Sequence, residues 1–129
     1  MLARAMRPAV AWAALIAFLC LTPATTLPTW EWADLLSVDK FVHAVMFGVL
    51  TWLLARGLRR RSTNALSDGR LLLVAGAASF FYGASMEVLQ QIPGLGRQGD
   101  WVDLTANTIG ALVGALWLNW RWARKGIAA

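Results

Sequence analysis

The chain has 129 residues, of which 58% are hydrophobic and 15% are charged, and its formal net charge at pH 7 is +5. Soluble domains carry about a quarter charged residues, and one of this length cannot bury so much apolar surface. The composition therefore predicts a single membrane domain over residues 1–129. The only cysteine, Cys20, excludes an intramolecular disulfide and a cysteine-based metal site.

The first apolar run extends from Ala9 to Leu21 and follows a short basic segment that contains Arg4 and Arg7. Taken alone, this pattern fits a signal peptide as well as a first transmembrane helix over residues 5–21. Such a helix lies at the lower limit for crossing the hydrocarbon core, which takes about 17–25 residues. The segment that follows is rich in proline and tryptophan, which suits an interfacial stretch better than a regular helix.

Three further apolar runs predict helices over residues 40–58, 71–90 and 102–120. A polar linker rich in arginine separates the first two, and a glycine-rich loop separates the last two. Together with residues 5–21, these runs predict an all-α, integral membrane four-helix bundle. An even number of spans places both termini on the same side of the membrane.

The two sides differ in charge. All but Lys40 and Arg97 of the 12 lysine and arginine residues fall on the side of the termini and of the linker between residues 56 and 70. Because basic segments stay inside, this predicts cytoplasmic N- and C-termini in a bacterial cytoplasmic (inner) membrane, and it favours a first run that is retained as a helix. The basic excess then reflects topology and a contact with anionic membrane lipids. It does not indicate a nucleic-acid partner.

Ionisable and amide side chains gather at the opposite, outer ends of the predicted helices. Asp39 and His43 are four residues apart, as are Asp103 and Asn107, so each pair shares a helix face. Glu87 lies near the end of the run that precedes the outer loop. These positions predict one outward-facing polar pocket. Its predicted binding residues are Asp39, Lys40, His43, Glu87, Gln90, Arg97, Asp103 and Asn107.

A simpler interpretation treats these residues as interfacial helix ends. Asp39 and Asp103 then only stabilise the positive ends of two helix dipoles. His43, Glu87 and Asn107 fit this interpretation less well, because they fall about one turn inside apolar stretches. Polar groups at that depth normally face the bundle or a water-filled cavity and find partners there.

His43 and Glu87 are the candidate catalytic residues, because a site of low dielectric constant suits general acid–base chemistry. The chain has no His-Glu-x-x-His zinc pattern, no Gly-x-Ser-x-Gly elbow and no Gly-Lys-Ser/Thr phosphate loop, so no metal and no other cofactor is predicted. The alternative to catalysis is a phosphate headgroup bound by two parallel hydrogen bonds from Arg97, alone or with a divalent cation on the carboxylates.

Gly110 and Gly114 form a pair of small residues four positions apart, which is typical of helices whose backbones approach closely. The run over residues 71–90 contains Gly76 and Gly83 as similar small positions. The sequence therefore predicts that Gly110 and Gly114 pack within the bundle, with the last two helices against each other. Dimerisation through the same face is the alternative.

In combination, these motifs resemble the VanZ-like family of small membrane proteins. They cover roughly residues 39–118, in the family order. The chain departs from the family at Ala44, where an aromatic residue is common, and its loop before the arginine is slightly longer. The matching pieces are Asp39-Lys40-x-x-His43, Glu87-x-x-Gln90, the loop from Pro93 to Arg97, and Asp103-x-x-x-Asn107-x-x-Gly110-x-x-x-Gly114.

The resemblance implies an α-helical membrane protein of the cell envelope, in a family whose name-giving member is linked to low-level resistance to the glycopeptide teicoplanin. Three functions stand as alternatives. The first is binding of a lipid headgroup, a lipid-linked cell-wall precursor or a protein partner in the outward pocket. The second is an intramembrane enzyme acting on a lipid-linked envelope substrate, with His43 or Glu87 as the acid–base group. The third is an assembly subunit that packs on another helix through Gly110 and Gly114.

Overall fold

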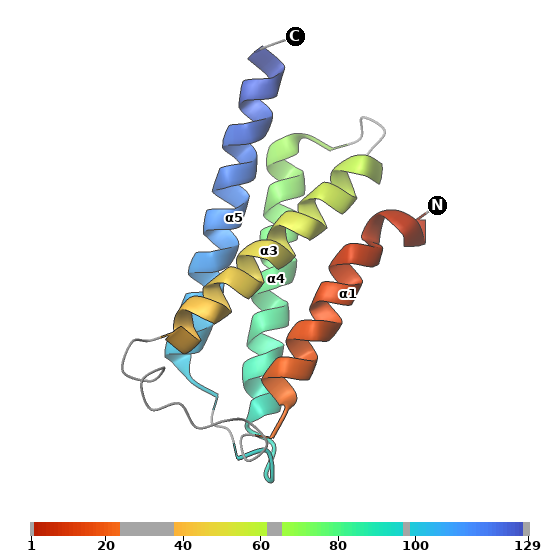
Figure 1. Ribbon diagram of the computed structural model, residues 1–129. Coiled ribbons are helices and arrows are strands. Elements are labelled where there is room, and N and C mark those ends of the chain that lie inside the picture. Colours follow the sequence, from red (N-terminus) through yellow and green to blue (C-terminus); the bar gives the residue numbers. More distant parts are fainter. Residues whose placement is uncertain (1, 24–37, 62–65, 97–98, 128–129) are drawn as a thin grey trace.

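The described part of the chain forms four long helices (Figure 1). The computed structural model describes residues 2–23, 38–61, 66–96 and 99–127. The helices predicted to end at residues 58 and 120 continue to Arg61 and Ile127, because the arginine, lysine and alanine residues in these extensions are good helix formers. The helices are α1 (Leu2–Leu21), α3 (Val38–Arg61), α4 (Asp68–Gln90) and α5 (Trp101–Ile127).

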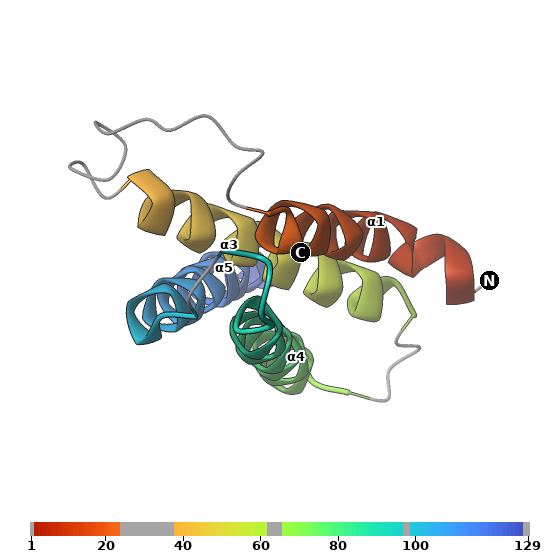
Figure 2. The ribbon, with the colours of Figure 1, turned by 90° about the horizontal axis from the view of Figure 1, so that it is seen from below.

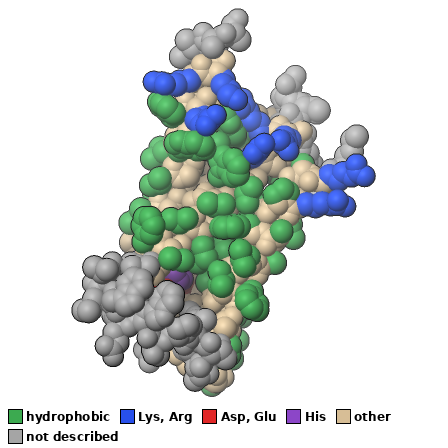
Figure 3. All heavy atoms as spheres, viewed as in Figure 1, with side chains coloured by type: hydrophobic (Ala, Val, Ile, Leu, Met, Phe, Trp, Pro, Cys, Tyr) green, Lys and Arg blue, Asp and Glu red, His purple; other side chains and the backbone are tan. Residues whose placement is uncertain are grey.

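All four helices are long and apolar enough to cross a membrane, with mean hydropathies between 1.2 and 1.6. Large apolar side chains such as Phe18, Leu73 and Phe81 point outward and are 67–72% exposed, as lipid-facing residues are. Hydrophobic side chains cover the middle of the face seen in Figure 3, and lysine and arginine side chains lie nearer one end. The chain is thus a multi-pass, all-α four-helix bundle, as predicted.

The two ends of the bundle differ in charge. The start of α1, the end of α3, the start of α4 and the end of α5 lie toward the same end of the bundle (Figure 1), and we call this the basic end because lysine and arginine side chains collect there (Figure 3). At the opposite end α3 and α5 begin and α4 ends, and we call this the polar end. It carries the acidic residues Asp39, Glu87, Asp100 and Asp103. The fold therefore brings both helical termini to one end, as the predicted topology requires. The cytoplasmic location of the basic end remains a prediction.

The most extensive helix contact joins α3 to α5. A methyl group on Gly110 would overlap the backbone carbonyl of Ala44, and one on Gly114 would come within 2.6 Å of the Gly48 carbonyl oxygen. The two glycines therefore pack within the bundle, but against α3 rather than against the helix that contains Gly76. Small residues on α3 provide the complementary surface, whereas Gly76 faces open space.

The interior combines apolar packing with a few paired polar groups. Phe47 is fully buried at the centre of a cluster that includes Ile16, Leu50 and Met86. Gly83 allows α4 to approach this centre, since a methyl group there would lie 3.1 Å from the Phe47 ring and 3.3 Å from the Asn107 amide nitrogen. Close packing of α4 on α5 at this level brings the polar end of α4 next to α5.

α1 lies against α3 and α4, and Figure 2 shows it on the side of α3 away from α5. Within the part of the chain that the structure describes, three side-chain hydrogen bonds attach it. The Trp12 indole donates to the Met46 carbonyl (2.9 Å), the Tyr82 hydroxyl donates to the Ala13 carbonyl (2.6 Å), and the Gln90 amide donates to the Cys20 carbonyl (3.0 Å). Such bonds stabilise helix packing where no water is available.

The loop after α4 folds back over the end of that helix. Gly94 and Gly96 have φ angles of 99° and 61°, which residues with a side chain rarely adopt. At Gly99 an added methyl group would collide with the backbone carbonyl of Glu87. The glycines therefore permit a short return path, which starts α5 directly beside Glu87.

Candidate functional site

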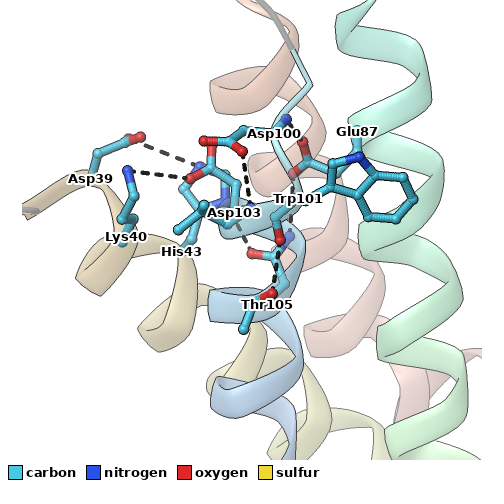
Figure 4. A network of polar contacts seen from close by, with 10 residues as sticks. Asp39, Lys40, His43, Glu87, Asp100, Trp101, Asp103 and Thr105 are labelled. Atoms are coloured by element: carbon cyan, nitrogen blue, oxygen red, sulfur yellow. Dashed lines mark hydrogen bonds and ion pairs between the residues drawn. The ribbon is translucent and has the colours of Figure 1, made fainter.

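Three helices bring charged and amide side chains together at the polar end (Figure 4). α3 contributes three residues from its first two turns, α4 contributes one and α5 contributes two. The seventh, Asp100, directly precedes α5. We call this group the polar cluster. Its members are Asp39, Lys40, His43, Glu87, Asp100, Asp103 and Asn107.

A chain of hydrogen bonds crosses the interior of the polar cluster. The Asp100 backbone N–H donates to Glu87 Oε2 (3.0 Å), and Asn107 Nδ2 donates to Glu87 Oε1 (3.5 Å). An ionised carboxylate only accepts hydrogen bonds, so this contact fixes the orientation of the Asn107 amide. Asn107 Oδ1 then faces His43 Nδ1 at 3.0 Å. Because Oδ1 only accepts, Nδ1 of His43 carries a proton and donates it to this bond.

The second ring nitrogen of His43, Nε2, lies near the carboxylates of Asp39 on α3 and Asp103 on α5. Nε2 lies 3.9 Å from Asp39 Oδ1, and Lys40 Nζ lies 3.9 Å from Asp103 Oδ1. Both distances exceed the range of a hydrogen bond, so the charges are close but not directly bonded. The exposed fractions of the side chains rise outward, from 5% at His43 and 14% at Asp103 to 39% at Lys40 and 56% at Asp39. The cluster therefore has a buried base and an open mouth.

The base of the cluster is almost completely excluded from solvent. Glu87, His43 and Asn107 are 6%, 4% and 1% exposed. A charge inside a membrane-spanning helix costs about 2.5–3.5 kcal/mol even by the lowest scales, so it is retained where partners offset that cost. Here Glu87 has two donors and His43 has one acceptor within the described residues.

Asp100 has a role that the predicted binding set did not include. Its side chain accepts a hydrogen bond from the Val102 N–H (3.0 Å), and its carbonyl accepts one from the Leu104 N–H (3.1 Å). It therefore caps the start of α5, which is the role that the simpler interpretation gave to Asp103. Asp103 lies inside the first turn instead and faces Lys40. An aspartate just before the apolar run was the available signal for this cap.

Two predicted binding residues do not join the cluster among the described residues. Gln90 is 3% exposed and donates to the Cys20 carbonyl, so it attaches α4 to α1 rather than facing the mouth. Arg97 lies outside the described residues, and the predicted phosphate contact from its guanidinium stays a prediction. The other six predicted binding residues, Asp39, Lys40, His43, Glu87, Asp103 and Asn107, come together.

A cavity of about 390 Å³ lies on the other side of Glu87, between α4 and α5. Apolar side chains such as Phe80, Val88 and Leu104 line most of it, and Trp101 stands at its edge with 83% of its surface exposed. Its lining combines Glu87 and Asp100 of the polar cluster with the exposed apolar side chains Val88 and Trp101. No pattern in the sequence indicates it, because its walls come from two helices whose relative rotation is set by tertiary packing.

Four spanning helices and a buried polar cluster at one end define a small multi-pass helical membrane protein. The model of the VanZ/LLP1 family matches residues 4–122, so the chain belongs to this family. The match includes α1, which the motifs at residues 39–118 did not reach. No curated protein and no solved structure matches the chain.

Proposed function

We propose that this VanZ/LLP1 protein binds the phosphate-bearing headgroup of a lipid or lipid-linked cell-wall precursor at the outer face of the bacterial cytoplasmic membrane. The polar cluster is the binding site. The observation that carries the proposal is the buried hydrogen-bond chain from Glu87 through Asn107 to His43, whose free ring nitrogen opens toward the mouth. The family resemblance relates such binding to the cell envelope and to susceptibility to teicoplanin-type glycopeptides.

A purely structural role explains the mouth less well. Residues that serve only to stabilise a membrane bundle are expected to satisfy one another fully, because no water is available to replace a missing partner. Here His43 Nε2 and the nearest carboxylate oxygen of Asp39 stay 3.9 Å apart. The Asp103 Oδ1 atom is buried and makes no hydrogen bond within the described residues. Polar atoms left in this state favour a ligand that completes the site.

The cavity beside Glu87 supports an amphiphilic ligand. Its apolar walls suit a hydrocarbon chain, while Glu87 and Asp100 at its rim belong to the polar cluster. A molecule with a polar head and an apolar tail would therefore reach the site laterally from the bilayer. Lys40 is the cation that the described mouth offers to a phosphate, and the predicted contact from Arg97 would add a second.

The first experiment separates a binding site from structural pairing. The variants His43→Gln and Glu87→Gln are compared with Asp68→Asn, a control at the basic end whose carboxylate pairs with Arg59 (3.2 Å). Co-purified lipids are identified by native mass spectrometry, and membrane abundance and glycopeptide susceptibility are measured in cells. We expect normal abundance, a changed susceptibility and loss of one retained lipid species for the two cluster variants alone. Loss of abundance for both variants would instead show that the cluster is structural.

An intramembrane enzyme is the second candidate, and the orientation of His43 favours it. The Asn107 amide fixes the proton on Nδ1, so in the neutral imidazole Nε2 carries a lone pair that can accept a proton from a substrate. Purified protein incubated with a panel of lipid-linked precursors would then convert one of them. Turnover that disappears in Glu87→Gln, with the lipid still bound, would replace the binding proposal by this one.

A further inference from the structure

We infer that the mouth of the polar cluster binds a divalent transition-metal cation through Asp39, His43 and Asp103. Each of these residues offers one ligand atom, and the three atoms lie within 4.8 Å of one another. Ligands of Zn²⁺ or Mn²⁺ stand about 2.0–2.2 Å from the ion, so neighbouring ligand atoms are about 3–4 Å apart. The observed group needs only small side-chain movements to reach that spacing, and Asp39, the exposed member, is the most free to move. The sequence shows no metal-binding motif here, because the ligands come from two helices, and it left a divalent cation on the carboxylates only as an alternative.

The orientation of His43 is the first support. A histidine that binds a metal through one ring nitrogen usually donates the other N–H to a fixed acceptor, which sets its tautomer and direction. His43 donates from Nδ1 to Asn107, and Asn107 is itself held by Glu87. The lone pair on Nε2 therefore points toward the carboxylates of Asp39 and Asp103. A lone pair facing carboxylate oxygens is repulsive unless a cation or a proton lies between them.

The buried polar atoms are the second support. The His43 side chain is 5% exposed, and Nε2 makes no hydrogen bond within the described residues. The Asp103 Oδ1 atom is likewise buried and without a hydrogen-bond partner there. One ring nitrogen of His43 and one carboxylate oxygen of Asp103 lie within 4.8 Å of each other, so a single cation could contact both residues.

Lys40 is the competing cation. Its Nζ atom lies 3.9 Å from Asp103 Oδ1, and its side chain is 39% exposed. A long, partly exposed side chain can move into water when a divalent ion enters, because its ammonium group remains hydrated there. We therefore expect removal of the Lys40 charge to strengthen metal binding. A site in which Asp103 serves only to hold Lys40 would show the opposite, a loss of stability and no metal.

The donor set indicates the class of ion. One imidazole and two carboxylates suit Zn²⁺ and Mn²⁺ better than Mg²⁺ or Ca²⁺, which prefer oxygen ligands alone. Three protein ligands leave coordination positions open, as in sites that receive a water molecule or a substrate oxygen. The cation site stands on geometry alone, whereas its use in headgroup binding rests on the proposed function.

The cation would also resolve an imbalance of charge. The cluster contains four carboxylates, on Asp39, Glu87, Asp100 and Asp103, against one lysine and a histidine that is neutral when it binds a metal. These carboxylates weaken the attraction that Lys40 alone offers to a phosphate. A divalent ion would offset the charge of two of the carboxylates and offer the phosphate a direct ligand position.

The test uses the full chain, purified in detergent and freed of metal with a chelator. Zn²⁺ is titrated against a chromophoric competitor, and Mn²⁺ is titrated by electron paramagnetic resonance. We expect one equivalent to bind. Asp39→Asn and Asp103→Asn should weaken metal binding strongly. Asn107→Leu should weaken it by about 10-fold to 100-fold, as expected when a metal-binding histidine loses the acceptor that orients it. Lys40→Gln should strengthen it. Asp68→Asn should bind as the unaltered chain does.

A measurement on the unaltered protein keeps the inference falsifiable if a variant fails to fold. Bound Mn²⁺ should show electron spin-echo modulation from one directly coordinated imidazole nitrogen, since the chain has one histidine. Absence of stoichiometric binding or absence of the nitrogen signal would each overturn the inference. So would metal affinities of Asp39→Asn and Asp103→Asn that equal the affinity of the unaltered chain. Metal binding is read without any lipid present, so failure of the headgroup proposal leaves this result standing, and the reverse also holds.

Discussion

The Nδ1 atom of His43 lies 3.0 Å from the Oδ1 atom of Asn107, although the two residues are 64 positions apart in the chain. This contact joins α3 to α5 at the depth where both helices are buried, and it determines which nitrogen of His43 is left for other chemistry. Asn107 is therefore a positioning residue, with one face toward His43 and the other toward Glu87.

Replacement of Asn107 by leucine should destabilise the protein by about 1–3 kcal/mol, because it leaves the His43 N–H and the Glu87 carboxylate without partners in a buried place. Thermal unfolding in detergent would measure this. Asn119→Leu is the matched control, since Asn119 lies on the same helix and is exposed. Equal melting temperatures for the two variants would contradict a paired, buried Asn107.

The crossing of α3 and α5 gives a second prediction. Gly110→Ala should lower the free energy of unfolding by about 1–3 kcal/mol, because the added methyl group overlaps the Ala44 carbonyl and the helices must move apart. Gly76→Ala is the control, because nothing lies within 4 Å of a methyl group there. It should be neutral, or stabilising by about 0.5–1 kcal/mol through better helix propensity. The prediction fails if Gly110→Ala behaves as Gly76→Ala does.

The attachment of α1 can be tested by removing single donors. Tyr82→Phe deletes the hydroxyl that donates to the Ala13 carbonyl and should reduce stability by about 0.6 kcal/mol, up to about 1.7 kcal/mol, as for other interhelical bonds in membranes. Trp120→Phe, at an exposed indole on α5, should have no such effect. Chemical denaturation in mixed micelles would measure both, and a Tyr82→Phe variant as stable as the parent would show that α1 docks by apolar packing alone.

The basic end gives a prediction about lipid partners. A cavity of about 430 Å³ between α3 and α5 is lined by five basic side chains and by tryptophans that stack on some of them. Bilayers that contain anionic lipid should therefore raise the melting temperature above that in zwitterionic bilayers, and Arg121→Gln should reduce this difference. Identical melting in the two bilayers would show that these arginines serve orientation alone. The basic side chains are Arg56, Arg59, Arg60, Arg121 and Lys125.

Membrane orientation can be tested directly. A reporter fused after Ala129 should report the cytoplasm, and one inserted between Gly94 and Gly96 should report the outside, because the basic end is predicted inside. An external C-terminus would move the polar cluster to the cytoplasmic face. The headgroup proposal would then lose its outer-leaflet ligand, while the cation site would be unaffected.

Local spacing was sufficient to predict the four spans and the shared faces of Asp39 with His43 and of Asp103 with Asn107. Both depend only on helix periodicity and on the length of apolar runs. The rotation of each helix about its own axis does not follow from spacing. For that reason the sequence predicted that Gly110 packs within the bundle but did not identify α3 as its partner, and the turn of Gln90 toward α1 was missed.

The hydrogen bonds that connect the helices needed the structure for the same reason. Asn107 was expected to have a partner, but nothing in the sequence showed that it would bond to His43 on one side and to Glu87 on the other. The role of the Asp100 backbone N–H was also hidden, because it depends on how the glycine-rich loop returns to Glu87.

Two of the three bonds that attach α1 use its backbone carbonyls, at Ala13 and Cys20, rather than its side chains. Every residue type supplies a carbonyl, so these two bonds by themselves require no particular side chain at Ala13 or Cys20. In evolutionary terms, the two bonds depend on the α4 donors Tyr82 and Gln90, whereas the sequence of α1 is restricted by its packing side chains, such as the fully buried Ile16. We therefore expect relatives to share Tyr82 and Gln90 more often than Ala13, which supplies only its carbonyl to this contact.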